Sequence, residues 1–368
     1  MTETRDSSRL RIGPFEVVGA IARGATCEVV KALDSDQGRT VAIKILSPGL
    51  VGNPDALARF ERESHALAEL QHPNIARIYG SGIAPDGRPY FALEFVEGQS
   101  LMGLILDKVE MPLAQQLDLM IQAAEGLRAA FQSNIIHRDV KPANLMVEMG
   151  ISLKIVDFGL AKIVREGASQ KGAGLFMGTP RYMATEVVLG RPADHRSDIY
   201  SLGATFYHLL TGRPPYDGDT PAAVMDQHVR SSLTPPHLFN PEIPADVSDI
   251  VEKAMAKEPG HRYHDYDELL SDLKAAKMAC VARERQSSRA SVSEGQPADS
   301  PVEISNEPSR RPAKQSFRRW ALVAVAVVVL LAGAFYVSQW RPLDKSNRLL
   351  PTLVRTLLDH LGKREPVP

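Results

Sequence analysis

Cysteine is nearly absent from this sequence of 368 residues, because only Cys27 and Cys280 occur and they lie far apart. Two such residues cannot form a disulfide framework or a zinc site with closely spaced ligands. The scarcity therefore fits a reducing compartment. The first residues, 1–11, also lack the apolar run of a secretory signal peptide.

An excess of either charge is absent as well. The 43 Lys and Arg residues and the 44 Asp and Glu residues leave a net charge of −1. Bulk electrostatics consequently argues neither for nor against binding to nucleic acid or anionic lipid. No internal repeat is visible, and the hydrophobic share of 44% is that of an ordinary globular protein. A chain of this length holds two or three average domains, or one large domain of two lobes.

The composition changes sharply twice near the C-terminus. Residues 281–319 are rich in Ser, Pro, Arg and Glu, and they bury too little apolar surface to offset chain entropy, which predicts a disordered linker. Residues 320–340 then carry no charge, and they are long enough to cross a hydrocarbon core of about 30 Å as a helix. Trp320 and Trp340 lie where interfacial aromatic residues belong.

The alternative to a transmembrane helix is a helix buried in a protein core. Such a helix needs neighbouring elements on all sides, and neither the linker before it nor the short tail after it, 341–368, offers them. The sequence therefore favours a membrane span. The tail has leucines near helical spacing, and it is either a short amphipathic helix on the far side of the membrane or a partly ordered remnant without a function.

The rest of the chain follows a polar N-terminal tail, 1–12, and divides into a strand-rich and a helix-rich part. Residues 13–95 alternate short β-branched runs with turns, and one helical stretch from about Asp55 to Leu70 interrupts them. Beyond Leu113 the periodicity is mostly helical. The predicted fold class is α+β, with a small sheet-rich lobe followed by a larger helical lobe.

Two short motifs carry groups suited to phosphoryl transfer. The first is His-Arg-Asp-Val-Lys-Pro-Ala-Asn at 137–144, and the second is Asp-Phe-Gly at 157–159. Phosphoryl transfer requires one carboxylate that faces the substrate hydroxyl, together with oxygen ligands for a metal ion on the phosphates. Asp139 supplies the first, and Asn144 and Asp157 supply the second.

These motifs resemble the catalytic loop and the metal-binding motif of eukaryotic-type, or Hanks-type, protein kinases. Lys141 stands two residues after Asp139, as in the Ser/Thr-specific members, and Asn144 stands five residues after it. The resemblance covers residues 13–277, which would form lobes at 13–95 and 99–277. It is greatest to the bacterial receptor-type Ser/Thr kinases, which carry a cytosolic kinase, a linker and a single span.

Further matches concern the nucleotide. Val41-Ala42-Ile43-Lys44 resembles the third strand of the family, whose lysine holds the α- and β-phosphates, whereas an ordinary strand lysine is a solvated edge charge. Glu63 occupies the place of the lysine's partner on the following helix, and its competitor Glu61 lies on a different face. Residues 91–98 resemble the hinge that binds adenine through backbone groups, with Leu93 as the gatekeeper.

The resemblance thus implies ATP and Mg²⁺ as ligands, with Mn²⁺ as an alternative metal. The catalytic residues that it implies are Lys44, Asp139, Lys141 and Asn144, and the metal ligands are Asn144 and Asp157. The residues that it implies for nucleotide contact are Ala22, Gly24, Cys27, Val29, Ala42, Lys44, Glu63, Leu93, Glu94, Val96 and Asp157.

The downstream segment also matches the family. Residues 178–186 resemble the end of the activation segment, where Thr179 favours Ser/Thr acceptors. Asp198 matches the buried helix aspartate that braces the catalytic loop. Arg262 is expected to pair with Glu186 in a structural ion pair.

Two segments depart from the pattern, at three positions. The phosphate-covering loop keeps only its central glycine, Gly24, while Ala22 and Cys27 take the outer positions. Both are small, so the backbone can still approach phosphate with some loss of affinity. Cys27 is either a small residue in a small slot or a redox switch. Thr185 replaces an expected proline, which predicts a looser turn without loss of chemistry.

Hydroxyl groups are scarce in the predicted activation segment. Because Arg138 precedes the catalytic aspartate, phosphate on this segment is expected to pair with it and to activate the protein. Ser169 is the one hydroxyl residue between Gly159 and Thr179. The hypothesis is that Ser169 or Thr179 is the main phosphosite, or that activation needs little phosphate.

The favoured hypothesis is a membrane-anchored kinase that phosphorylates Ser/Thr residues of proteins, including its own. The basic residues on the two sides of the span are nearly balanced, so the cytosolic location of ATP places the kinase domain in the cytoplasm. Tethering is expected to favour a homodimer and phosphorylation in trans, and no nucleic acid partner is expected. The alternative is a pseudokinase scaffold that no longer turns over; a small-molecule phosphotransferase ranks third, because residues 178–186 resemble a peptide-docking platform.

Overall fold

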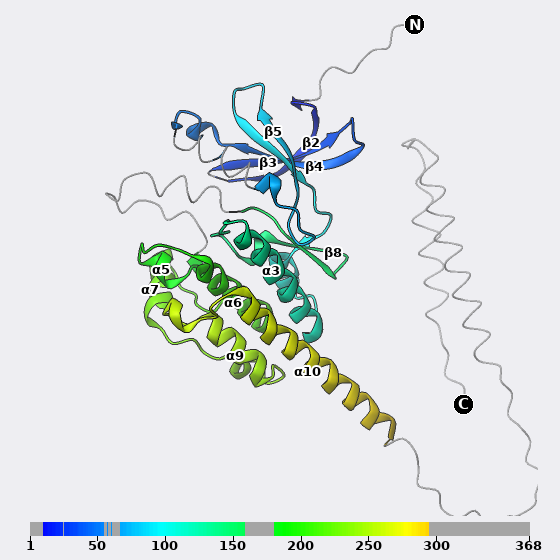
Figure 1. Cartoon of the computed structure of the whole chain (residues 1–368), viewed down its shortest axis with the longest axis vertical. Helices are drawn as coiled ribbons and strands as arrows, with labels where there is room; N and C mark the ends of the chain where they lie inside the picture. Colours follow the sequence, from blue (N-terminus) through cyan, green and yellow to red (C-terminus); the bar gives the residue numbers. More distant parts are fainter. Residues whose placement is uncertain are drawn as a thin grey trace, which may run out of the picture. The chain divides into compact units, whose positions relative to one another are not determined.

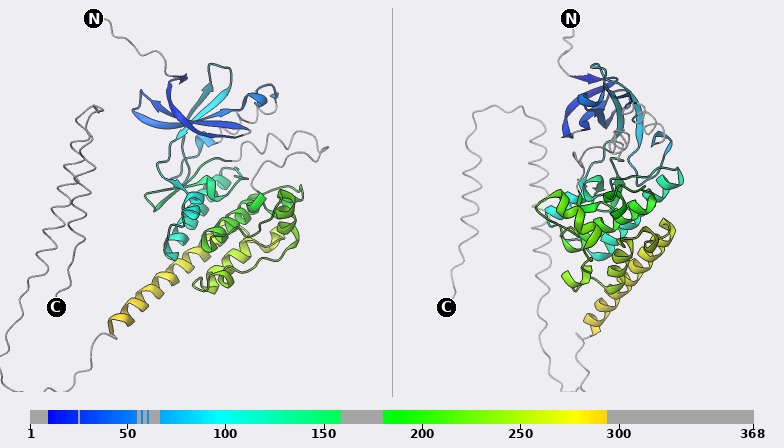
Figure 2. Two further views of the ribbon diagram at one scale, coloured as in Figure 1. Left: turned by 180° about the vertical axis from the view of Figure 1, so that it is seen from behind. Right: turned by 90° about the vertical axis from the view of Figure 1, so that its left-hand side faces the viewer.

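The computed structural model describes residues 10–24, 26–54, 57, 60, 67–158 and 180–293, all within one compact unit. Within these ranges, no helix is both long enough and apolar enough to cross a bilayer. The predicted span at 320–340 and the predicted tail at 341–368 lie outside the described residues. The strands and the helices form two lobes, as Figure 1 shows and the two views of Figure 2 repeat.

The first lobe is built on a six-stranded antiparallel sheet with the strand order β1-β2-β3-β4-β6-β5. Its strands are β1 (Arg11–Ile12), β2 (Phe15–Arg23), β3 (Cys27–Asp34), β4 (Arg39–Leu46), β5 (Ile78–Ile83) and β6 (Pro89–Glu94). These strands coincide with the β-branched runs of the sequence, so the predicted strand-rich lobe is confirmed.

Strand β4 has an apolar face that packs in the core of the first lobe and a second face that carries Lys44. Val41, Ile43 and Ile45 alternate along it and are buried in the apolar cluster on one face of the sheet. Lys44 lies between them and therefore projects from the opposite face, opposite Val29 of β3. The alternation of the sequence thus places an ammonium group under the sheet, toward the second lobe.

The predicted helix near 55–70 is described only in part. Pro54, Leu57, Phe60 and residues 67–69 are helical, after a short 3₁₀ turn η1 (Pro48–Leu50). Phe60 stacks on Phe91 of β6 with the ring centroids 4.0 Å apart. Glu63 and its competitor Glu61 lie outside the described residues, so the predicted Lys44–Glu63 pair stays a prediction.

The second lobe is helical, as predicted. Its α-helices are α2 (Leu101–Leu106), α3 (Leu113–Gln132), α5 (Thr185–Val188), α6 (His195–Thr211), α7 (Pro221–Arg230), α8 (Pro236–Phe239), α9 (Ala245–Ala254) and α10 (Tyr266–Ser293). Short 3₁₀ turns stand at η2 (Pro142–Asn144), η3 (Pro180–Tyr182) and η4 (Pro259–His261). Helix α6 is buried along most of its length and forms the centre of this lobe.

In a small second sheet, one strand follows the first catalytic motif and another strand precedes the second motif. Its strands β7 (Gln99–Ser100), β8 (Leu145–Glu148) and β9 (Ser152–Ile155) pair in that order. Strands β8 and β9 form an antiparallel hairpin in which Leu145 lies opposite Ile155. Because the strands run in opposite directions, the residues just before β8 and just after β9 must lie side by side.

Helix α10 differs from the prediction at its C-terminal end. The sequence predicts that a disordered linker begins at 281, but the helix continues to Ser293. The continuation has a tertiary partner, because Arg283 forms an ion pair of 2.8 Å with Asp246 of α9. Because this segment is polar, its sequence gives no sign of this contact.

Candidate active site

The β8–β9 hairpin brings the two predicted motifs together. Asn144 precedes β8, and Val156 and Asp157 follow β9. The backbone N–H of Val156 donates to the carbonyl oxygen of Asn144 at 2.9 Å, which joins the two ends of the hairpin. The two residues predicted as metal ligands, Asn144 and Asp157, are therefore positioned by one hairpin.

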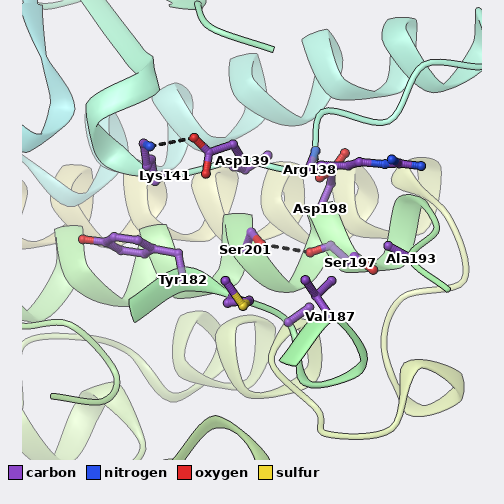
Figure 3. Close-up of a pocket in the computed structure, with 12 residues that line it drawn as sticks. Arg138, Asp139, Lys141, Tyr182, Val187, Ala193, Ser197, Asp198 and Ser201 are labelled. Carbon is purple, nitrogen blue, oxygen red and sulfur yellow. Dashed lines mark hydrogen bonds and ion pairs between the residues drawn. The ribbon is translucent and has the colours of Figure 1, made fainter. Parts of the chain in front are cut away.

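Asp139 lies in a network of hydrogen bonds within the catalytic loop. Lys141 Nζ donates to Asp139 Oδ2 at 2.6 Å, and Figure 3 shows this pair. The side-chain nitrogen of Asn144 donates to the carbonyl oxygen of Asp139 at 2.9 Å and to Asp139 Oδ2 at 3.1 Å. Asn144 is 5% exposed, and this orientation turns its amide oxygen away from Asp139.

Lys44 reaches across the cleft from the first lobe. Its Nζ lies 2.6 Å from Asp157 Oδ1. Burial alone would lower the pKa of Lys44, but the carboxylate of Asp157 outweighs it, with help from the charge of Asp139, so the pKa is raised. Lys44 is therefore a cation at neutral pH, and Lys44, Asp139, Asn144 and Asp157 converge as the sequence predicts.

Asp198 of α6 holds the catalytic loop from below. It is 2% exposed, and its two carboxylate oxygens accept the backbone N–H groups of His137 at 2.7 Å and Arg138 at 2.8 Å. The ring of His137 packs on Phe158, with the centroids 4.5 Å apart. The predicted bracing aspartate thus connects α6 to the loop, and His137 connects the loop to the Asp157-Phe158 motif.

The predicted phosphate-covering loop is the turn between β2 and β3. Ala22 pairs with Val29, and the N–H of Gly24 donates to the carbonyl oxygen of Cys27 at 2.9 Å. A Cβ atom on Gly24 would lie 3.3 Å from that carbonyl oxygen, so glycine suits the tight turn. Burial raises the pKa of the Cys27 thiol, which favours the small-residue interpretation over a reactive thiolate.

The predicted hinge lies at the end of β6. Ala42 of β4 pairs with Leu93 of β6, which puts both at the same level of the sheet. A cavity of about 20 Å³ behind them is lined by Lys44, Leu93 and Asp157, among others. Glu94 pairs through its side chain with Lys154 at 3.0 Å, and Val96 is buried. Of the residues predicted for nucleotide contact, Lys44, Leu93 and Asp157 line this cavity together. Glu63 lies outside the described residues, and nucleotide contact by the other residues stays a prediction.

A second cavity, of about 50 Å³, lies beside Asp139 (Figure 3). The catalytic loop lines one side with Arg138, Asp139 and Lys141. The segment from η3 to α5 lines the other side, with Tyr182, Met183, Ala184 and Val187. This segment is the described part of the predicted peptide-docking platform at 178–186. Ser169, Gly178 and Thr179 lie outside the described residues.

The predicted ion pair between Glu186 and Arg262 is present and buried. Both side chains are at most 6% exposed, and Arg262 Nη2 lies 2.7 Å from Glu186 Oε2. Burial would raise the pKa of Glu186, but hydrogen bonds from Arg262 and Ser197 outweigh it and hold the pKa below its ordinary value. The pair anchors α5 to η4, away from the reacting groups.

Sequence reasoning missed a polar cluster behind this segment. The cluster joins three helices and the segment after α9 through hydrogen bonds, and its members are Thr185, Tyr200, His228 and Lys257. The histidine of α7 and the lysine after α9 carry no motif that points to one another. The replacement of an expected proline by Thr185 was the one available signal.

The donor set fits a Mg²⁺ ion bound to nucleotide phosphates. Asn144 and Asp157 offer an amide oxygen and a carboxylate oxygen, which are ligands that Mg²⁺ prefers, and few protein ligands suffice when phosphates supply others. Asp157 is 45% exposed at its side chain although it contacts Lys44, so one side of the carboxylate is accessible.

The fold and the site together define a two-lobed protein with a lysine and a candidate metal-binding pair between its lobes. The family model of the protein kinase domain matches residues 15–272. The chain therefore belongs to the protein kinase family.

Its curated relatives are bacterial. Serine/threonine-protein kinase PknB of Mycobacterium tuberculosis is 37% identical over 276 residues, which cover 74% of this chain and 43% of that protein. A probable serine/threonine-protein kinase of Streptomyces coelicolor is 37% identical over 267 residues, which cover 72% of this chain and 40% of that protein. The chain thus matches only about two fifths of the length of these relatives.

Solved structures agree on the fold. The kinase domain of PknI from Mycobacterium tuberculosis is 26% identical, with a TM-score of 0.58, and the match covers 73% of this chain and 98% of that domain.

Proposed function

We propose that this protein transfers the γ-phosphate of ATP to Ser/Thr hydroxyls of proteins, including its own. The observation that carries this proposal is the convergence of Lys44, Asp139, Asn144 and Asp157 between the lobes. In the proposed reaction, the acceptor oxygen forms a bond to the γ-phosphorus, the bond from phosphorus to the β–γ bridging oxygen breaks, and ADP leaves.

Each group has a distinct role in this proposal. Asp139 orients the acceptor hydroxyl and takes its proton, and Lys141, 2.6 Å from Asp139, steadies the transferred phosphate. Lys44 holds the α- and β-phosphates. Mg²⁺ held by Asn144 and Asp157 would neutralise phosphate charge.

The test is phosphate transfer from labelled ATP to a generic basic protein. Asp139→Asn and Lys44→Ala should each reduce transfer by at least about a hundredfold, because each removes a group that acts at the reacting phosphate. Asp267→Asn and Lys274→Ala are matched controls, because both side chains form surface ion pairs on α10 and should leave transfer unchanged. Equal silence of the wild type and both variants would favour the pseudokinase scaffold.

We further propose that residues 320–340 anchor the protein in the cell membrane with the kinase domain in the cytoplasm. The support is the charge-free run between two tryptophans in the sequence. We propose that the anchored protein acts in signal transduction. It would phosphorylate a second copy in trans within a homodimer, with Ser169 or Thr179 as the phosphosite.

A further inference from the structure

Thr185 stands where the family pattern has proline, and the structure gives its hydroxyl a partner that proline could not bind. Thr185 is the first residue of α5 and is 6% exposed. Its Oγ1 donates to the backbone carbonyl oxygen of His228 at 3.1 Å. The substitution therefore replaces a rigid ring with a hydrogen bond between α5 and α7.

The carbonyl of His228 needs such donors because it lies in the last turn of α7. The last four carbonyl groups of a helix have no partner within the helix. Lys257 Nζ donates to the same carbonyl at 2.8 Å, to that of Gln227 at 3.2 Å and to the hydroxyl of Tyr216 at 2.8 Å. A cation at a helix C-terminus is also favourable electrostatically. Thr185 and Lys257 thus share one acceptor.

The side chain of His228 extends this junction toward α6. The ring is fully buried, and its Nδ1 lies 2.8 Å from the hydroxyl of Tyr200. Burial and the nearby charge of Lys257 lower the pKa of His228 to about 4, so the ring is neutral at pH 7. Burial likewise lowers the pKa of Lys257 to about 8, which shows how closely this cluster is packed.

The junction lies directly behind one wall of the cavity beside Asp139. Tyr182, Met183, Ala184 and Val187 line that cavity from the segment that Thr185 belongs to (Figure 3). Tyr182 is held from behind as well, since its hydroxyl lies 2.7 Å from Nδ1 of His208. The segment is thus connected to α6 through Tyr182 and to α7 through Thr185.

We propose that Thr185 is a positioning residue for the protein substrate, because its hydrogen bond to the His228 carbonyl holds residues 182–187 at their distance from Asp139. The residues that flank an acceptor hydroxyl at Asp139 lie against this wall. The proposed nucleotide site is at Lys44 and Asp157, which line the other cavity. Loss of the hydroxyl therefore weakens binding of the protein substrate and leaves binding of ATP unchanged. This inference rests on the proposed kinase activity.

The test compares three substitutions in the full chain. Thr185→Val keeps the shape without the hydroxyl, Thr185→Pro restores the family pattern without it, and Thr185→Ser keeps the donor. Thr211→Val is a matched control, because Thr211 Oγ1 also donates to a carbonyl near a helix end, that of Tyr207 at 2.8 Å, but Thr211 lies outside the segment 182–187 that contributes to the cavity wall. The KM for histone, the KM for ATP and kcat are measured for each protein.

Thr185→Val should raise the KM for histone about fivefold, the factor that corresponds to one hydrogen bond of about 1 kcal/mol. The KM for ATP should stay unchanged, and Thr185→Ser should restore the KM for histone. Hydrogen exchange should also accelerate in residues 180–190 of Thr185→Val, but not of Thr185→Ser or Thr211→Val. If Thr185→Pro is poorly folded, Thr185→Val still decides the question.

The outcomes separate the two proposals. Absence of transfer by the wild type overturns both the kinase activity and the positioning role. Normal transfer with an unchanged KM for histone in Thr185→Val overturns the positioning role alone. Equal effects on the two KM values, or the same effect in Thr211→Val, would also overturn it, because they indicate a general loss of stability.

Discussion

Arg138 and Asp157 hold backbone strain at the centre of the site. Both residues are in the left-handed region, with φ of 62° and 59°, where a residue with a side chain pays about 1 kcal/mol or more. The conformation of Arg138 persists because Asp198 accepts two adjacent backbone N–H groups, those of His137 and Arg138. The carboxylate of Asp198 therefore determines the shape of the loop that presents Asp139.

Substitution of Asp198 tests this dependence. Asp198→Ala removes the acceptor of two backbone N–H groups, one buried and one partly buried. Each unsatisfied buried group costs about 1–3 kcal/mol. We expect the free energy of unfolding to fall by about 2–4 kcal/mol, measured by urea titration of the purified chain. Asp198→Asn keeps one side-chain oxygen as an acceptor and should lose less. Equal stability of Asp198→Ala and the wild type would contradict this role.

Single residues differ in how far the sequence reveals their partners. Asp139, Lys141 and Asn144 lie within six residues of each other, so their network follows from a local motif. Lys44 and Asp157 are 113 positions apart and were predicted together only because the family pattern names both. Thr185, His228 and Lys257 have no such pattern, and their meeting depends on how α5 and α7 pack.

Elements of the first lobe could be predicted because short β-branched runs alternate with turns in the sequence. Val41, Ile43 and Ile45 fix which face of β4 is buried, and thereby which face carries Lys44. The end of α10 could not be predicted in this way. Its polar residues after Cys280 are typical of a linker, and an ion pair with α9 becomes visible only in three dimensions.

Helices α6 and α7 carry two buried histidines that make stability depend on pH. Burial lowers the pKa of His208 and of His228 to about 4, below the ordinary 6.5. Between pH 6.5 and 4 the unfolded chain therefore binds protons that the folded chain does not bind. Protonation favours unfolding, so stability falls with decreasing pH by up to about 1.4 kcal/mol per pH unit for each histidine.

Urea titrations at pH 7, 6, 5 and 4.5 measure this slope. His208→Gln should reduce it, because glutamine offers a hydrogen-bonding group to Tyr182 without binding a proton. His264→Gln is the matched control for the substitution itself, since the side chain of His264 is 91% exposed and its replacement leaves the core intact. A slope that stays the same in His208→Gln would show that this histidine does not titrate in the window.

At the scale of the whole molecule, the described residues end within the polar segment, 281–319, that precedes the charge-free run. Helix α10 ends at Ser293, and the charge-free run begins at Trp320. If that run spans a membrane, the segment between them sets how far the active site can travel from the bilayer. Neighbouring copies then share a thin layer, and their local concentration exceeds the bulk concentration.

Deletion of residues 320–340 tests both the anchor and its consequence. We expect the deleted protein to leave the membrane fraction and to phosphorylate histone at the rate of the full chain, because Lys44, Asp139, Asn144 and Asp157 are untouched. Its autophosphorylation at low protein concentration should fall about tenfold or more relative to the full chain in lipid vesicles, and the initial rate should rise with the square of concentration.

A replacement of residues 320–340 by an unrelated apolar segment of equal length separates tethering from any specific contact. Tethering alone predicts that this chimera regains both membrane fractionation and fast autophosphorylation. Autophosphorylation within one molecule predicts a rate proportional to concentration in every variant. In that case the wild type would also fail to phosphorylate the Asp139→Asn chain when the two are reconstituted in the same vesicle. This outcome would contradict phosphorylation in trans, although it would not contradict the membrane span.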